Sequence, residues 1–194
     1  SGTLQKIGYR SFAGTALTRL VLPASVKEIG GEAFQDCLQL TNVEFNKGLQ
    51  TIKDHAFKNS GLASLELPEG IKEIGEWSFE GCKSLKTVQI PQSVTTLGTG
   101  AFYACSALES VVIPASVTNF NDRTFNGCRN LSAVYYLGSS CPSLGQYTFA
   151  DVSNAFGFYV KPSALSVLQG IAYVSGKVKD SFPYQQVSKY TTFS

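Results

Sequence analysis

The sequence is poor in the residues on which most enzymes depend. It has a single histidine, His55, and its fourteen acidic residues are scattered without the paired spacing of a glycoside hydrolase. The motifs G-x-x-x-x-G-K, G-x-S-x-G and G-x-G-x-x-G do not occur, so the usual loops for phosphate binding or for a nucleophilic serine are missing. His55 precedes an Ala-Phe pair at a position that varies between repeats, which is typical of a solvated surface residue. We therefore predict a protein that is not an enzyme, with no catalytic residue and no cofactor.

Charge is also scarce, and neither sign is in large excess. Sixteen Lys and Arg against fourteen Asp and Glu give a formal net charge of +2, without the basic cluster that nucleic-acid binding requires. Apolar residues make up 43% of the chain, which is too many for a disordered protein. No run of eighteen apolar residues is present, so we predict no transmembrane segment. One His and no C-x-x-C pair predict no metal site.

What the sequence does contain is a repeat marked by phenylalanine. Seven Phe residues recur at intervals of 22 to 24 residues, each preceded by a small side chain and, five positions earlier, by an apolar one. A unit of this length cannot bury its own apolar face, whereas stacked units bury a continuous core. We therefore expect every ring of this phenylalanine column to be buried. Its members are Phe12, Phe34, Phe57, Phe79, Phe102, Phe125 and Phe149.

Each unit also carries a strand signal and, in most cases, a glycine. Segments such as LTRLVLP from Leu17, LKTVQIP from Leu85 and LESVVIP from Leu108 alternate apolar and polar residues before a proline. This alternation predicts a short half-buried strand that the proline ends. The recurring glycine follows the apolar residue five positions before the Phe, and we interpret it as a turn position with positive φ. It occurs at Gly8, Gly30, Gly75, Gly98 and Gly145.

Four of the five cysteines share one column, three residues after the Phe. They are Cys37, Cys82, Cys105 and Cys128, and shorter units carry Thr15 or Ser60 there. Cys141 aligns with apolar core residues of other units. Buried free cysteine behaves as a small apolar residue, so we predict five free thiols. A bridge between cysteines of successive units is the alternative that the spacing permits.

These repeats resemble a known family. The segment SVTTLGTGAFYACSALESVVIP, residues 93–114, is similar to the BspA-type leucine-rich repeat of bacterial surface proteins, and the likeness extends over roughly residues 4–150. The later segments FYVKPSALSVL and SFPYQQV resemble the closing unit of that family. The resemblance implies an α/β, right-handed, horseshoe-like solenoid with short turns and helical corners. It also implies a place at the surface of a bacterium or outside it, and binding to extracellular proteins, host proteins or other cells.

The repeats divide the chain into two regions. Residues 1–143 hold six leucine-rich repeats that start near residue 7, and residues 144–194 hold a last partial repeat and a C-terminal cap. Within the cap, Ser163 is a good N-cap for a short helix over Ala164–Gln169. The first residue falls inside a repeat and no signal peptide precedes it, so we expect a C-terminal piece of a longer protein, whose signal and anchor lie elsewhere.

Two functions of different classes fit these observations. The first is a non-catalytic protein-binding or adhesion module, and the alternative is a structural spacer with no ligand of its own. For a binding module we expect contact through strand side chains that point away from the core, with Tyr135 as the strongest contact and the glutamates favouring basic partners. Trp77, in the same variable column as His55, is a rival contact residue. The predicted binding face comprises Arg19, Asn42, Glu44, Glu66, Gln89, Val112 and Tyr135.

Overall fold

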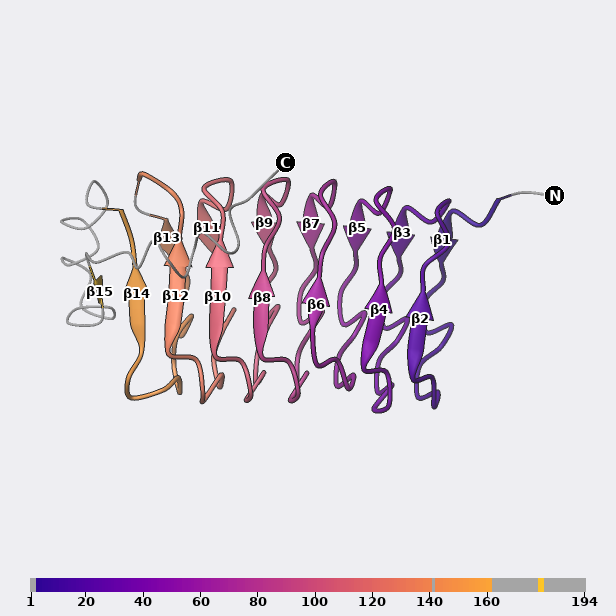
Figure 1. Cartoon of the computed structure of the whole chain (residues 1–194), viewed down its shortest axis with the longest axis horizontal. Helices are drawn as coiled ribbons and strands as arrows, with labels where there is room; N and C mark the ends of the chain where they lie inside the picture. The colour runs from indigo at the N-terminus through magenta and orange to yellow at the C-terminus, as the bar shows by residue number, and fades with distance from the viewer. Residues whose placement is uncertain (1–2, 141, 162–177, 180–194) are drawn as a thin grey trace.

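The computed structural model describes residues 3–140, 142–161 and 178–179, and it forms a solenoid of stacked repeats (Figure 1). Each repeat contributes one short strand to each of two rows of parallel strands. The first row is a single sheet of two-residue strands: β1 (Lys6–Ile7), β3 (Glu28–Ile29), β5 (Thr51–Ile52), β7 (Glu73–Ile74), β9 (Thr96–Leu97), β11 (Asn119–Phe120) and β13 (Ser143–Leu144).

The second row holds the strands that the Leu-x-x-Val/Leu-x-apolar pattern predicts. Every pair in it is parallel and joins equivalent positions of successive repeats, as in Val88 opposite Val111. The strands are β2 (Arg19–Val21), β4 (Asn42–Glu44), β6 (Leu65–Glu66), β8 (Thr87–Gln89), β10 (Ser110–Ile113), β12 (Ala133–Tyr136), β14 (Gly157–Tyr159) and β15 (Val178–Lys179).

The second row is interrupted once. Strands β6, β8, β10, β12, β14 and β15 form one six-stranded sheet, whereas β2 and β4 form a separate pair. Among the described strands no pairing joins β4 to β6, although β3 and β5 pair normally in the first row of the same two repeats. The second and third repeats are therefore held together on one side by strand pairing, and on the other side by side-chain packing and a backbone bond from the Ala63 N–H to the Thr41 oxygen at 3.3 Å.

The expected helical corners are absent from the described residues, so the fold is a β-solenoid rather than α/β. Around each Phe, alternate backbone N–H groups bond in two different ways. In the second repeat, the N–H groups of Ala33, Gln35 and Cys37 donate to the carbonyl three residues earlier. The N–H groups between them donate instead to the next repeat, as from Phe34 to the Ala56 oxygen at 2.8 Å. Because half of the N–H groups in each corner donate to the neighbouring repeat, the corner cannot form the i to i−4 hydrogen bonds of an α-helix.

Positive φ occurs in this corner, but not at the recurring glycine. Two columns adopt it, two residues before and two residues after each Phe, as at Trp77 (φ 52°) and Gly81 (φ 68°) in the fourth repeat. The glycines that we interpreted as turn residues lie outside both columns, so that interpretation is wrong. Their real role is close approach: a Cβ at Gly98 would lie 2.5 Å from the carbonyl carbon of Gly75 in the preceding repeat.

The phenylalanine column forms the centre of the core. Successive rings stack nearly parallel, with centroids 5.2–5.8 Å apart and interplanar angles of 1–8°. Six of the seven rings are buried, as predicted. The exception is Phe12, whose side chain is 36% exposed because it has a stacking partner, Phe34, on one side only.

The cysteine column lies beside the ring stack and is fully buried. Cys37, Cys82, Cys105 and Cys128 are free, and each thiol donates to the carbonyl oxygen of the Phe in the preceding repeat, at 3.0–3.3 Å. In the shorter repeats the hydroxyl groups of Thr15 and Ser60 occupy the column and lie 3.3–3.4 Å from the next sulfur. Burial raises the pKa of the Cys82 thiol to about 12. Cys141 and the predicted helix over Ala164–Gln169 lie outside the described residues.

Thiol titration tests the redox prediction. In denaturant without reductant, the protein should show close to the five thiols that its sequence contains. In the folded protein at pH 8, the four described thiols should react far more slowly, because they are buried and because burial keeps the Cys82 thiol protonated well above that pH. A denatured count of one or three would show that the cysteine column is cross-linked.

Candidate binding face

Two halves of the second row of strands differ in accessibility. Of the residues that we predicted to form a binding face, Arg19, Asn42, Glu44 and Glu66 are exposed and Gln89 is half-buried. These five residues belong to β2, β4, β6 and β8, so the accessible part of the predicted face lies toward the N-terminal repeats.

The C-terminal half of the face corrects one expectation. Val112 is 5% exposed and Tyr135 is 7% exposed, so neither offers the accessible side chain that we predicted. Together with Ala133 they form a small apolar cluster, in which the Tyr135 ring stacks on the Tyr159 ring with centroids 5.0 Å apart. Tyr135 therefore contributes to packing, and Tyr135→Ala would change stability as well as any binding.

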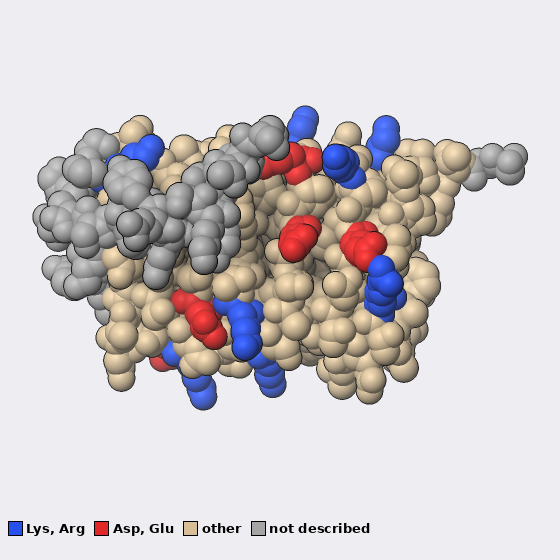
Figure 2. Space-filling view, in the orientation of Figure 1, with Lys and Arg blue, Asp and Glu red and all other residues tan. Residues whose placement is uncertain are grey.

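Charged groups on the accessible half are few (Figure 2). On β2 and β4, the Arg19 guanidinium donates to the Glu44 carboxylate, which neutralises that pair. Glu66 lies in the next repeat, opposite Gln89 in the strand register. Its carboxylate has no ion-pair or hydrogen-bond partner within the part of the chain that the structure describes.

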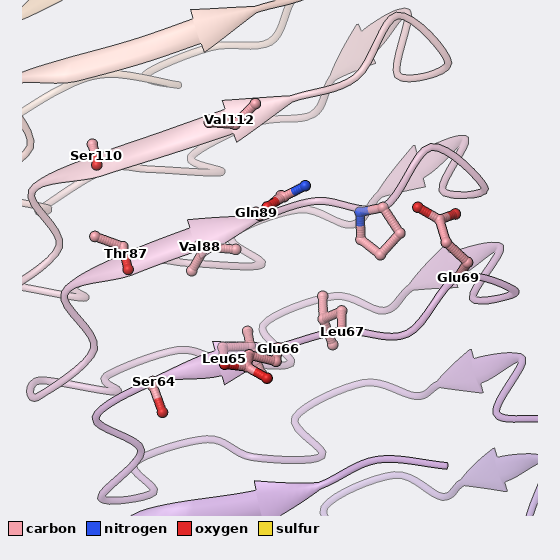
Figure 3. A pocket seen from close by; sticks show the side chains of 11 residues that line it. Ser64, Leu65, Glu66, Leu67, Glu69, Thr87, Val88, Gln89, Ser110 and Val112 are labelled. Carbon is pink, nitrogen blue, oxygen red and sulfur yellow. The ribbon is translucent and has the colours of Figure 1, made fainter. Parts of the chain in front are cut away.

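A hollow of about 460 Å³ lies on this half, across β6, β8 and β10 (Figure 3). The Val112 side chain, on the outer side of β10, is the apolar part of its floor, whereas Leu65 and Val88, which also line it, belong to the buried core. The small side chains of Ser64, Thr87 and Ser110 leave the hollow open. Glu66 borders it along β6. The lining is completed by Gln89 at the end of β8 and, beyond the C-terminal ends of the strands, by Leu67, Glu69 and Pro91.

Glu69 is fixed where it borders the hollow. Its two carboxylate oxygens accept backbone N–H bonds from Gln92 and Ser93 of the next repeat, each at 3.2 Å. The two charged residues that line the hollow are thus both acidic: Glu69 is held by backbone donors, and Glu66 has no partner among the residues that the structure describes. Sequence reasoning missed the hollow, although successive Ser64, Thr87 and Ser110 at the same strand position were a signal for it.

Trp77 and His55, which form the rival surface, both contact neighbouring side chains. The Trp77 ring is half-buried, makes an edge contact with Tyr103 at 5.4 Å, and lies over Gly100, where a Cβ would come within 2.7 Å of its Cδ2 atom. His55 has its Nδ1 atom 3.8 Å from a Glu80 oxygen that Lys58 also contacts at 3.0 Å. The structure does not bring His55 and Trp77 to the hollow on the sheet face.

Within the described ranges, no group of three or more His, Cys, Asp or Glu is placed to hold a metal ion. No helix in the same part of the chain is long and apolar enough to cross a membrane.

The fold is that of a leucine-rich-repeat solenoid, because it combines repeats of 22–24 residues, parallel strands in register and a stacked aromatic core. The model of the BspA type leucine rich repeat region matches residues 5–132 and 97–173, with six copies. The chain belongs to this family. A search of curated proteins gave no match.

Solved bacterial structures share the fold. The leucine rich repeat protein TpLRR of T. pallidum is 33% identical, with a TM-score of 0.75 over 91% of this chain and 79% of its own. A leucine-rich repeat protein of Bacteroides ovatus is 26% identical, with a TM-score of 0.61 over 82% of this chain. One of Eubacterium ventriosum is 22% identical, with a TM-score of 0.56 over 72% of this chain. The chain spans 48% and 44% of the lengths of these last two.

Proposed function

We propose that this chain is a non-catalytic protein-binding module of a bacterial surface protein, serving adhesion to extracellular proteins, host proteins or other cells. The observation that carries the proposal is the hollow across β6, β8 and β10, with an apolar floor and an acidic border on an otherwise sparsely charged sheet. Leucine-rich repeats commonly bind partners through their extended surfaces. Membership of the BspA-type family supports the same class of function.

A structural spacer is the second candidate. The continuous stack of phenylalanine rings and the corner hydrogen bonds between all neighbouring repeats favour it, because they make a rigid element that needs no ligand. A spacer would hold other domains of the same surface protein away from the cell. A binding module should retain a partner protein on the accessible sheet face, whereas a spacer should retain none.

Substitutions that fill the hollow distinguish the two functions. Thr87 is exposed on β8 and tyrosine is favoured in strands, so Thr87→Tyr should fold normally while it occupies the hollow. In capture of purified extracellular matrix proteins by the immobilised chain, we expect Thr87→Tyr to weaken retention by about tenfold or more. Trp77→Ala should leave retention unchanged.

The matched control is Thr96→Tyr, which makes the same change at an exposed position of β9 in the other row of strands. This variant should retain partners like the parent chain. Loss of retention in Trp77→Ala alone would move the binding surface to the rival column. No retention of any extracellular protein or cell by the parent chain would favour the spacer.

A further inference from the structure

We propose that the hollow across β6, β8 and β10 binds an extended basic segment of a partner protein, with a lysine or arginine beside Glu66 and apolar side chains on the floor. This inference rests on the proposed function and names the chemistry of the partner at that same site. It differs from a general contact surface because it predicts a preference for one charge and one kind of side chain.

Charge is the first argument. The chain as a whole carries a formal net charge of +2, yet both charged residues that line the hollow are glutamates. Glu44, one strand away, is already neutralised by Arg19, and Glu69 is bonded by two backbone N–H groups. Glu66 is left as the carboxylate without a partner in the described part of the chain. A cation placed there gains an ion pair and breaks no existing one.

The floor supplies the second argument. Val112 is apolar on the outer side of β10, and Leu67 adds a half-buried apolar side chain beyond the end of β6. Apolar side chains of a partner lose water when they cover this surface, which is worth about 25 cal/mol per Å² of buried apolar area.

The shape of the hollow favours an extended segment. It crosses three successive parallel strands, which are spaced by about 4.8 Å, and so it runs for roughly 10 Å across the sheet. An extended chain advances about 3.3 Å per residue, so about three residues match this length. The pair formed by Arg19 and Glu44 lies beyond one end, and at the other end Val112 belongs to the packed cluster around Tyr135.

The experiment uses the full 194-residue chain and labelled peptides with defined cores. The cores are Val-Lys-Val, Val-Gln-Val, Val-Glu-Val and Ser-Lys-Ser, each between Gly-Ser flanks, and fluorescence anisotropy measures their binding. We expect Val-Lys-Val to bind about tenfold more tightly than Val-Glu-Val and several-fold more tightly than Ser-Lys-Ser. Higher salt should weaken Val-Lys-Val binding, since exposed charges are screened over about 10 Å at ~0.1 M.

Glu66→Gln is the decisive variant. It should weaken Val-Lys-Val binding by about threefold to tenfold and leave Val-Gln-Val binding unchanged, since it removes only the charge at the hollow. The control is Glu73→Gln on β7, which makes the same charge change in the next repeat and in the other row of strands. This control should change affinity by less than about twofold.

Several outcomes would overturn the inference. These are equal binding of Val-Glu-Val and Val-Lys-Val, no binding of any of the peptides, or no effect of Glu66→Gln. The inference can fail alone: matrix-protein capture that is lost in Thr87→Tyr but unaffected by Glu66→Gln would keep the binding function and exclude a basic segment. Peptide binding without capture of any protein or cell would count against adhesion instead.

Discussion

Replacing Phe79 with alanine is expected to lower the free energy of unfolding by about 3–5 kcal/mol. The Phe79 ring is fully buried between Phe57 and Phe102, with centroid separations of 5.5 and 5.3 Å. Its removal would leave a cavity in the middle of the ring stack, and both neighbouring rings would lose a stacking partner. Urea unfolding, followed by circular dichroism, measures the effect.

Phe12→Ala is the matched control for this substitution. It truncates the same kind of ring at the exposed end of the stack, where Phe34 is the only ring of the column in contact. We expect the free energy of unfolding to fall by about 1 kcal/mol, since much of the Phe12 side chain is already exposed to solvent. If Phe79→Ala left the unfolding midpoint unchanged, the stacking register would be wrong.

The second large effect is expected from Gly98→Ala, which should lower the free energy of unfolding by about 3 kcal/mol. A Cβ at this position would lie 2.5 Å from the carbonyl carbon of Gly75 and 2.7 Å from the Cα of Glu76. These are backbone atoms of the preceding repeat, so relief requires that two repeats move apart, and overpacking of this kind costs about 1–3 kcal/mol or more. Urea unfolding of the variant measures it.

Gly14→Ala separates close approach from backbone conformation. Gly14 has positive φ, at 69°, and a Cβ there would have nothing within 4 Å. Its substitution should cost about 1 kcal/mol through the left-handed conformation alone. Gly98→Ala could lower the free energy of unfolding no more than Gly14→Ala does. The repeats would then not be in close contact at the recurring glycine.

The repeat could be predicted from sequence because its evidence is periodic. Seven phenylalanines at nearly constant spacing establish stacking, and alternation before each proline establishes the strands of the second row. The glycine was misinterpreted because sequence alone does not distinguish a glycine needed for positive φ from one needed for close approach. In this protein the positive φ falls largely on other residues, among them Arg10, Glu32 and Trp77.

The candidate site was less predictable for a related reason. Alternation along a strand gives the side on which a residue lies, but not whether that side is accessible, and so it placed Tyr135 on the face without revealing its burial. The hollow depends on the sizes of side chains from three repeats and on Glu69 beyond the strands. It is a property of neighbouring units together, which no single unit displays.

Because of the interruption between β4 and β6, the interfaces between successive repeats of the solenoid are not equally strong. Stability of a repeat array is approximately a sum of intrinsic repeat terms and nearest-neighbour terms, as in a one-dimensional Ising model. The link between the second and third repeats keeps the β3–β5 pairing, the corner hydrogen bonds and the bond from the Ala63 N–H to the Thr41 oxygen, but among the described strands it lacks the β4–β6 pairing. Cooperativity is therefore lowest at this link. The first two repeats can fray as a unit while the third and later repeats, which carry the hollow, stay folded.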